Sequence, residues 1–226
     1  MAAIREKAKK FHKFVKGLQE KYPQALPDEQ MKLLERFIFY LLFYSNPVTN
    51  AHKAFKALTD DKHFASWSEV RVATVRELTN ILRDSKVEPA EFLAPRLKEL
   101  LQNVFEEVDD VALEPLTERI EEAQTAKQKK DAAEKVRKFV TELPGIPPWG
   151  PQYLLAGLGL DPQLPLDPHT EAVLEAQKCF PPKSKLPEKK RVAKALLDGL
   201  EPLGPIEVHH LLVEHAKRDG AGGKKG

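Results

Sequence analysis

Residues 143–156 read LPGIPPWGPQYLLA, and residues 166–173 follow after a short gap as LDPHTEAV. In the first stretch, a helix-like segment stops at Leu-Pro-Gly, prolines make a tight turn, and a second apolar segment begins at once. In the second stretch, aspartate followed by proline is a favoured helix start, because aspartate caps free N–H groups and proline fits the first helical position. Together the two stretches predict a helical hairpin followed closely by a capped helix.

Helical periodicity extends from this hairpin over almost the whole chain, and no segment alternates apolar and polar residues as a half-buried strand does. Residues 33–44 are apolar on nearly every side, which is typical of a helix at the centre of a bundle. Residues 124–135 are unusually polar and predict a solvent-facing excursion. We therefore expect an all-α protein.

The composition narrows the class of protein. Of 226 residues, 42% are hydrophobic and 31% are charged, which fits a soluble globular chain and excludes a disordered one. The single cysteine, Cys179, excludes an intramolecular disulfide and any metal site that needs several thiolates. No secretory signal is seen, and the longest apolar stretch, residues 37–44, is too short to span a bilayer. We expect a cytoplasmic location, associated with the nucleoid if the source is bacterial.

The net charge of +2 argues only weakly for a nucleic-acid partner. The basic residues are nevertheless gathered in two places, in the first helix and around the start of the penultimate one. They are Lys7, Lys9, Lys10, Lys13 and Lys16 in the first cluster, and Lys183, Lys185, Lys189, Lys190 and Arg191 in the second. Taken alone, each cluster is better explained by a solvated helix face.

The hairpin followed by Asp167 resembles the signature of the endonuclease III branch of the helix-hairpin-helix DNA glycosylase superfamily. There, a helix ends in Leu-Pro-Gly-Val-Gly, a second helix begins at once, and a Val-Asp-Thr-His turn supplies the catalytic aspartate. Residues 41–54 and 206–215 are similar to two further segments of that family, so that the resemblance covers residues 30–218. It implies a base-excision-repair protein that binds double-stranded DNA containing a damaged base, as a monomer and without a membrane.

The resemblance also implies a two-lobed helical fold. One lobe is expected to be a helical barrel with the hairpin, over residues 27–160. The other lobe combines residues 1–26 with residues 161–218. Residues 219–226 are rich in glycine and lysine and are expected to form a disordered tail.

Two departures from the family pattern change the expected chemistry. The iron–sulfur cysteines of the family follow the last helix, where this sequence reads Gly-Lys-Lys-Gly, so we expect no iron–sulfur cluster and no other cofactor. Trp149 takes the position of the lyase lysine. Because an indole has no amine to form a Schiff base, lyase activity is not expected from this position.

In the family, the backbone of the hairpin grips DNA phosphate much as a helix N-terminus binds an anion. The resemblance therefore assigns DNA binding to Gly145, Ile146 and Gly150, with His169 as a further phosphate contact. Pro147 and Pro148 lack an N–H group, so two donors are lost and the grip is weakened. For His169, a solvent-facing position without a role is the alternative.

Four residues are candidates for the base pocket. Related alkylpurine glycosylases carry Trp at the position of Trp149, in a context that Gly150 and Tyr153 echo, and its face stacks on a flipped cationic base. Such a cation–π contact contributes about 1–2 kcal/mol. Ser45 and Asn46 lie where the family fills the gap left by the flipped base. The alternatives are core packing for Trp149 and a simple turn at Ser45 and Asn46.

A glycosylase needs a carboxylate close to the sugar, which becomes positively charged as the glycosidic bond breaks. By its place in the motif, Asp167 is the expected catalytic residue, although a helix cap alone also explains it. Two functions remain open. One is a monofunctional glycosylase that removes a damaged or mismatched base. The other is a fold kept without catalysis as a DNA- or protein-binding module.

Overall fold

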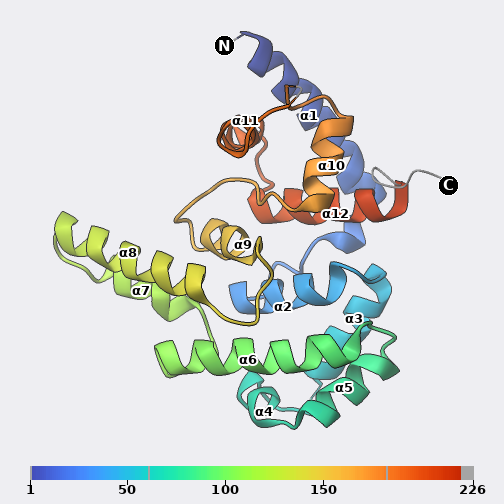
Figure 1. The fold of residues 1–226 in the computed structure, drawn as a ribbon, viewed down its shortest axis with the longest axis vertical. Helices are drawn as coiled ribbons and strands as arrows, with labels where there is room; N and C mark the ends of the chain where they lie inside the picture. Colours follow the sequence, from blue (N-terminus) through green and yellow to red (C-terminus); the bar gives the residue numbers. More distant parts are fainter. Residues whose placement is uncertain (1, 61, 182, 220–226) are drawn as a thin grey trace. The chain divides into compact units, whose positions relative to one another are not determined.

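The structure is a computed structural model that describes residues 2–60, 62–181 and 183–219. Within this part of the chain there are twelve α-helices, one short 3-10 helix and no strand (Figure 1). The prediction of an all-α fold is therefore confirmed.

The chain divides into two compact units. Residues 28–154 form the first, which we call the hairpin unit, and residues 1–27 with 155–226 form the second, the terminal unit. The second boundary falls inside α9 (Gly150–Gly157), whereas the sequence placed it after residue 160.

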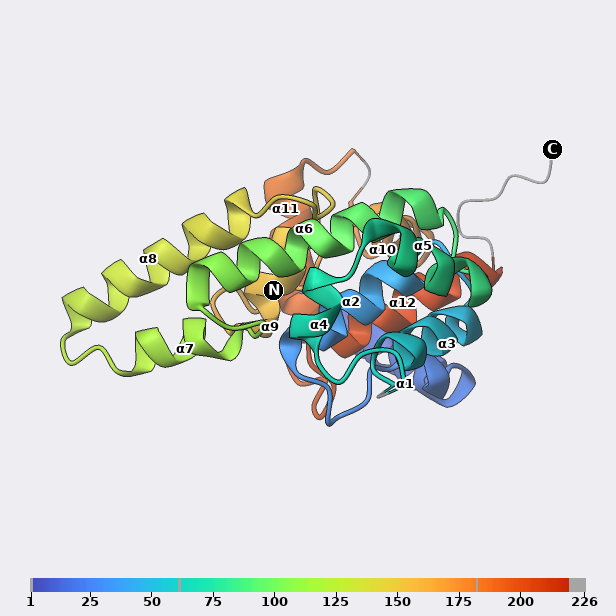
Figure 2. The same ribbon diagram turned by 90° about the horizontal axis from the view of Figure 1, so that it is seen from below.

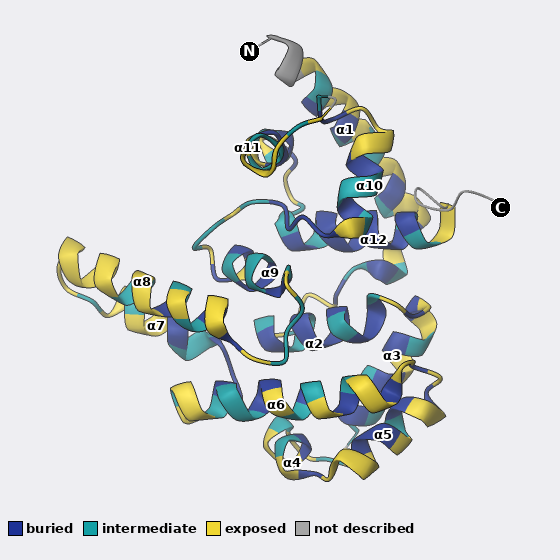
Figure 3. Ribbon diagram, in the orientation of Figure 1, coloured by how far each residue is buried: buried dark blue, intermediate teal, exposed yellow. Residues whose placement is uncertain are grey.

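The hairpin unit is built around α2 (Leu33–Phe43), whose sequence is apolar on nearly every side. Its buried side chains are those of Leu34, Phe37, Ile38, Phe39, Tyr40, Leu42 and Phe43 (Figure 3). The helix packs against α3 (Val48–Leu58) and α6 (Ala90–Val108). A helix that is apolar on all sides is stable in a central position, because each of its faces is removed from water.

Two shorter helices complete the base of this unit, α4 (Trp67–Val72) and α5 (Val75–Asp84), and both pack against α6. Helix α5 begins with a capping box. The Thr74 hydroxyl accepts the N–H of Glu77 at 3.2 Å, and the Glu77 carboxylate accepts the N–H of Thr74 at 2.8 Å. This reciprocal pair satisfies two backbone donors that a helix N-terminus leaves free.

Helices α7 (Glu114–Glu121) and α8 (Ala126–Glu142) form an antiparallel pair that extends away from α2 and α6 of the same unit (Figure 2). The polar residues 124–135 form the tip of this pair, and most of their side chains are exposed (Figure 3). The Thr125 hydroxyl caps α8 by accepting the N–H of Gln128 at 3.2 Å. A polar sequence can therefore form the first part of α8, because one long face of this helix is exposed to solvent.

The terminal unit contains α1 (Ala2–Lys21), α10 (Pro168–Ala176), α11 (Leu186–Leu197) and α12 (Pro205–Asp219). Helix α12 is buried along most of its length and packs against α1 and α10. It also carries two buried histidines.

The terminal unit ties its last helix to its first. The Asp219 carboxylate accepts hydrogen bonds from Lys21 at 2.6 Å and from the Tyr22 hydroxyl at 2.9 Å. Asp219, which the sequence assigned to the tail, is thus the last residue of α12. The rest of the expected disordered tail, residues 220–226, lies outside the described residues.

None of the described helices combines the length and the apolar character that are needed to cross a lipid bilayer. Among the same residues, no group of three or more His, Cys, Asp or Glu side chains is arranged to hold a metal ion.

Candidate functional site

The hairpin turn between α8 and α9 is shaped by two glycines. Gly145 has a φ of +78°, and a Cβ atom there would lie 3.0 Å from the carbonyl oxygen of Arg96. A Cβ on Gly150 would lie 3.1 Å from the side chain of Ile146. The sequence needs glycine at both positions because the turn lies directly on α6 and closes tightly on itself.

The turn has few amide donors to offer a phosphate. Pro147, Pro148 and Pro151 have no N–H group. The N–H of Gly150 donates to the carbonyl oxygen of Pro147 at 2.8 Å, and that of Gln152 donates to Trp149 at 3.1 Å. Helix α9 therefore begins without the set of free donors that makes an ordinary helix N-terminus an anion site. DNA binding by Gly145, Ile146 and Gly150 stays a prediction, and the Gly150 amide is already engaged.

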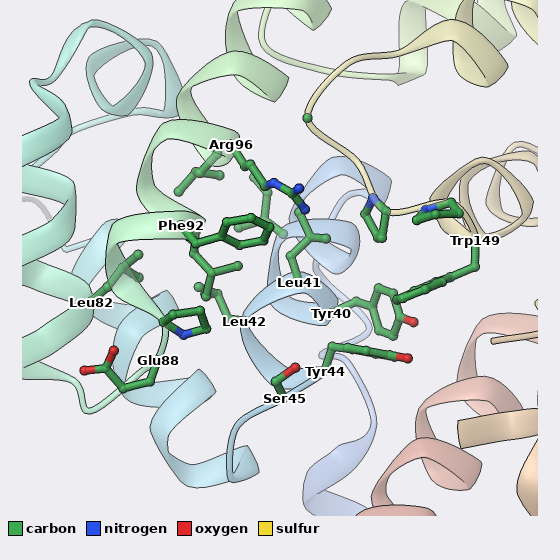
Figure 4. A pocket seen from close by; sticks show the side chains of 17 residues that line it. Tyr40, Leu41, Leu42, Tyr44, Ser45, Leu82, Glu88, Phe92, Arg96 and Trp149 are labelled. Carbon is green, nitrogen blue, oxygen red and sulfur yellow. The ribbon is translucent and has the colours of Figure 1, made fainter. Parts of the chain in front are cut away.

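An apolar cavity of about 400 Å³ lies beside this turn, within the hairpin unit (Figure 4). Pockets that bind small molecules have about 300–1,000 Å³ and mostly apolar walls. Helix α2 and the residues just after it supply one wall, the start of α6 another and the hairpin turn a third. Residues on its lining include Leu41, Tyr44, Ser45, Phe92, Arg96, Pro147, Pro148 and Trp149.

Trp149 is the predicted site residue that contributes most to this cavity. Its half-buried ring lies against that of Tyr44, with centroids 4.9 Å apart and planes inclined by 33°. The indole N–H is buried and has no hydrogen-bond acceptor among the described residues. A buried donor without an acceptor costs about 1–3 kcal/mol of stability.

The structure brings Trp149, Gly145 and Ser45 to the cavity but does not bring Tyr153 or Asn46 there. The Tyr153 ring is buried and stacks on Tyr40, with centroids 4.8 Å apart, and its hydroxyl donates to the Arg36 carbonyl at 3.2 Å.

Asn46 lies behind the cavity wall. Its side-chain amide donates to the carbonyl oxygens of Leu42 at 3.0 Å and Glu88 at 2.9 Å, and its oxygen accepts the Glu88 N–H at 2.8 Å. Asn46 thereby joins the end of α2 to the segment before α6.

Sequence reasoning missed most of the cavity lining, including Tyr44, Phe92 and Arg96. Tyr44 directly follows α2, and Phe92 with Arg96 forms a pair at i,i+4 on α6. The Arg96 guanidinium lies 3.6 Å from the centroid of the Phe92 ring, and half of the Phe92 surface is exposed. An aromatic and an arginine at i,i+4 are a local signal of such a stack, but not of the cavity behind it.

Asp167 is the N-cap of α10 in the terminal unit. Its Oδ1 accepts the N–H of Thr170 at 2.7 Å, and the Thr170 hydroxyl accepts the N–H of Asp167 at 2.8 Å. This capping box uses one carboxylate oxygen. The other, Oδ2, lies 3.3 Å from Nε2 of His209 on α12, and both side chains are without exposed surface.

His209 is held in one tautomer. Its Nδ1 lies 3.1 Å from the carbonyl oxygen of Pro165, which can only accept, so that Nδ1 carries the proton. Burial lowers the pKa of His209, and the nearby Asp167 charge opposes that effect without overcoming it. The ring is therefore neutral at pH 7 and is not a counter-ion for Asp167.

His169 lies two residues after Asp167, in the first turn of α10. The ring is half-buried, and burial lowers its pKa against the opposing charge of Asp167. The nearby Lys217 has a pKa lowered to about 8, also by burial, while Glu214 works in the opposite direction. A neutral His169 is a weak phosphate ligand, so its DNA contact stays a prediction.

Comparisons with known proteins support the fold. No family model and no curated protein matches the sequence. A solved structure of a trapped covalent intermediate between endonuclease III and DNA is similar, with a TM-score of 0.53 and 14% sequence identity. The match covers 93% of this chain and 86% of that chain. The chain thus has the helical fold of endonuclease III, as the hairpin and the Asp-Pro-His-Thr segment predicted.

Proposed function

We propose that the protein is a monofunctional DNA glycosylase, which hydrolyses the N-glycosidic bond of a damaged or mismatched base in duplex DNA. The fold supports DNA repair in general terms. The observation that carries the enzymatic part is Asp167, whose carboxylate caps α10 with one oxygen and turns the other toward a neutral histidine.

The reaction is favoured by a negative charge in a region of low dielectric constant. When the glycosidic bond breaks, its electron pair leaves with the base and the sugar becomes a cation, to which water then adds. The field of a buried carboxylate stabilises that cation more strongly than it would in water. Because His209 is neutral, it does not cancel the charge of the Asp167 carboxylate, which the Thr170 N–H holds in place.

The cavity beside Trp149 supports an aromatic, electron-poor base as the substrate. The faces of Trp149 and Tyr44 attract a cationic ring, as an alkylated purine is. Such a base leaves as a neutral molecule and needs no proton. Alkylated purines are therefore the first lesions to test.

The test is release of free base from a panel of duplexes that carry alkylated, oxidised or mismatched bases. We expect release from alkylated duplexes, with intact strands until alkali is added and no covalent complex on treatment with borohydride. Release from none of the duplexes contradicts the proposal. A borohydride-trapped complex, for which Lys217 with its lowered pKa is the first suspect, contradicts the monofunctional mechanism.

A second function, binding of DNA or protein without catalysis, is favoured by two observations. The hairpin lacks amide donors at Pro147 and Pro148, and the Asp167 side chain has no exposed surface. Gel shifts with intact, abasic and alkylated duplexes over a salt series separate the two functions. Equal affinity for all three, together with no base release, supports the binding module, whereas preference for the damaged duplexes opposes it.

A further inference from the structure

We propose that the terminal unit has a second, sequence-independent contact with DNA, a basic hollow that binds phosphate groups of the backbone. This rests on the proposed function only in taking DNA as the ligand. The hollow has about 890 Å³ and lies among α1, the end of α10 and the start of α11. Its lining includes Lys7, Lys178, Phe180, Lys183, Ser184 and Lys189.

The lysines of the hollow differ in how far their charge is neutralised. Lys189 lies 2.6 Å from the carboxylate of Glu171 and 2.9 Å from that of Glu175. Lys7 instead donates to the carbonyl oxygen of Cys179 at 3.1 Å. Within the described residues, Lys178 and Lys183 form no ion pair. Three charges thus remain available to an anion, and a phosphate would relieve their mutual repulsion.

The backbone conformation at the two unpaired lysines indicates that the fold does not require lysine at these positions. Lys178 has a φ of +55° and Lys183 a φ of +62°. Lys178 follows α10 at the place where helices usually carry glycine, and the Cys179 N–H donates to the Leu174 carbonyl at 2.9 Å in the usual way of such ends. Lysine is strained in this conformation and glycine is not. Lys86 has the same conformation outside the hollow, so what marks the hollow is the coincidence of this conformation with unpaired charge.

The surroundings suit an anion such as phosphate. Ser184 directly precedes Lys185, the N-cap of α11, so the positive end of a helix dipole lies beside the hollow. Glu175 also lies on the lining, but its carboxylate lies 2.9 Å from the Lys189 ammonium, which offsets its charge. A lysine binds phosphate as a point charge without strict geometry, which suits a backbone contact that reads no sequence.

The test compares two double variants. Lys178→Gln with Lys183→Gln removes the unpaired charges of the hollow, and Lys129→Gln with Lys130→Gln removes two exposed lysines of α8. Affinity for an undamaged fluorescent duplex is measured over a salt series. Each lost phosphate contact flattens the plot of log K against log salt by about 1, so the hollow variant should lose about 2 and bind roughly tenfold more weakly at moderate salt. The α8 variant should behave like the wild type.

An unchanged salt slope in the hollow variant overturns the proposal. Inorganic phosphate and an acidic peptide are titrated at constant ionic strength to separate the sources of the anion. If either one binds the wild type but not the hollow variant, while the DNA slope is unchanged, the hollow serves that ligand instead. Base release, measured at saturating protein, tests the proposed glycosylase activity separately from the hollow. Base release should persist in the hollow variant. If the wild type releases no base, that result counts against the glycosylase activity and not against the hollow.

Discussion

The two units of this chain carry different chemistry. The hairpin unit offers an apolar cavity lined by Trp149 and Tyr44, next to a turn whose prolines have removed backbone donors. The terminal unit holds the buried carboxylate of Asp167 and a hollow with unneutralised lysines. In the proposed function, the hairpin serves mainly apolar contact, while the charges that would act on DNA belong to the terminal unit.

Removal of the Trp149 ring is the strongest test of the role of the apolar cavity in the hairpin unit. Trp149→Ala removes the stacking face, and a cation–π contact of about 1–2 kcal/mol corresponds to a loss of roughly five- to thirtyfold in base release. The loss should be confined to cationic, alkylated bases. Trp149→Phe, which keeps a smaller face, should lose less. An equal loss on neutral lesions would mean that Trp149 only supports the fold.

Returning the lost donors to the turn is the next test. Pro147→Gly with Pro148→Gly restores two N–H groups, and hydrogen bonds to a charged phosphate contribute about 1.5–3 kcal/mol each at best. We expect about tenfold tighter binding of undamaged duplex, measured by fluorescence anisotropy, which is the lower end of what one such bond supplies. Pro162→Gly, at an exposed proline of the terminal unit outside the hollow, is the control. Unchanged binding would show that the turn does not meet DNA.

The buried histidines link stability to pH. Burial lowers the pKa of His209 and of His169 in the folded state, so below the unfolded value of about 6.5 the unfolded chain binds more protons. The free energy of unfolding is therefore highest above pH 6.5 and falls as the pH drops, by up to about 1.4 kcal/mol per pH unit for each histidine.

Urea unfolding between pH 5 and 8 measures this slope. His209→Gln should make the unfolding free energy depend less steeply on pH. His169→Gln should remove the part of this dependence that His169 contributes. Protonation of His209 would also place a positive charge beside Asp167, so base release should fall over the same range. If both variants keep the pH dependence of stability seen in the wild type, the group that titrates is neither of these histidines.

The smallest effect concerns the strained lysines. Lys178→Gly relieves a left-handed residue and should stabilise the protein by about 1 kcal/mol. Lys86→Gly, with the same conformation in the hairpin unit, should stabilise by a similar amount. Thermal unfolding checks both. Destabilisation by Lys178→Gly would mean that the lysine is held there by contacts of the fold rather than kept for its charge.

The sequence predicts the local features of this protein well. Helix periodicity locates the helices, the Leu-Pro-Gly turn locates the hairpin, and Asp-Pro locates the cap at Asp167. Each of these depends on residues within one or two turns of helix, where propensity and capping act.

The features that the sequence does not predict are the long-range ones. Nothing near Asp167 indicates that His209 lies against its second oxygen, and nothing near Trp149 indicates that Phe92 and Arg96 share its cavity. Such pairs depend on how separate helices pack, which periodicity leaves open. The loss of hairpin donors is visible as prolines, but the engagement of the Gly150 amide by Pro147 is visible only in the structure.

The most direct measurement is the single-turnover rate of base release from an alkylated duplex by Asp167→Asn. Asparagine keeps the helix cap and the shape but removes the charge, so circular dichroism should be unchanged while the rate falls about a hundred- to thousandfold. Asp198→Asn, at an exposed carboxylate of the same unit, should match the wild type. A rate for Asp167→Asn equal to that of the wild type would contradict the role of this carboxylate and, with it, the proposed mechanism.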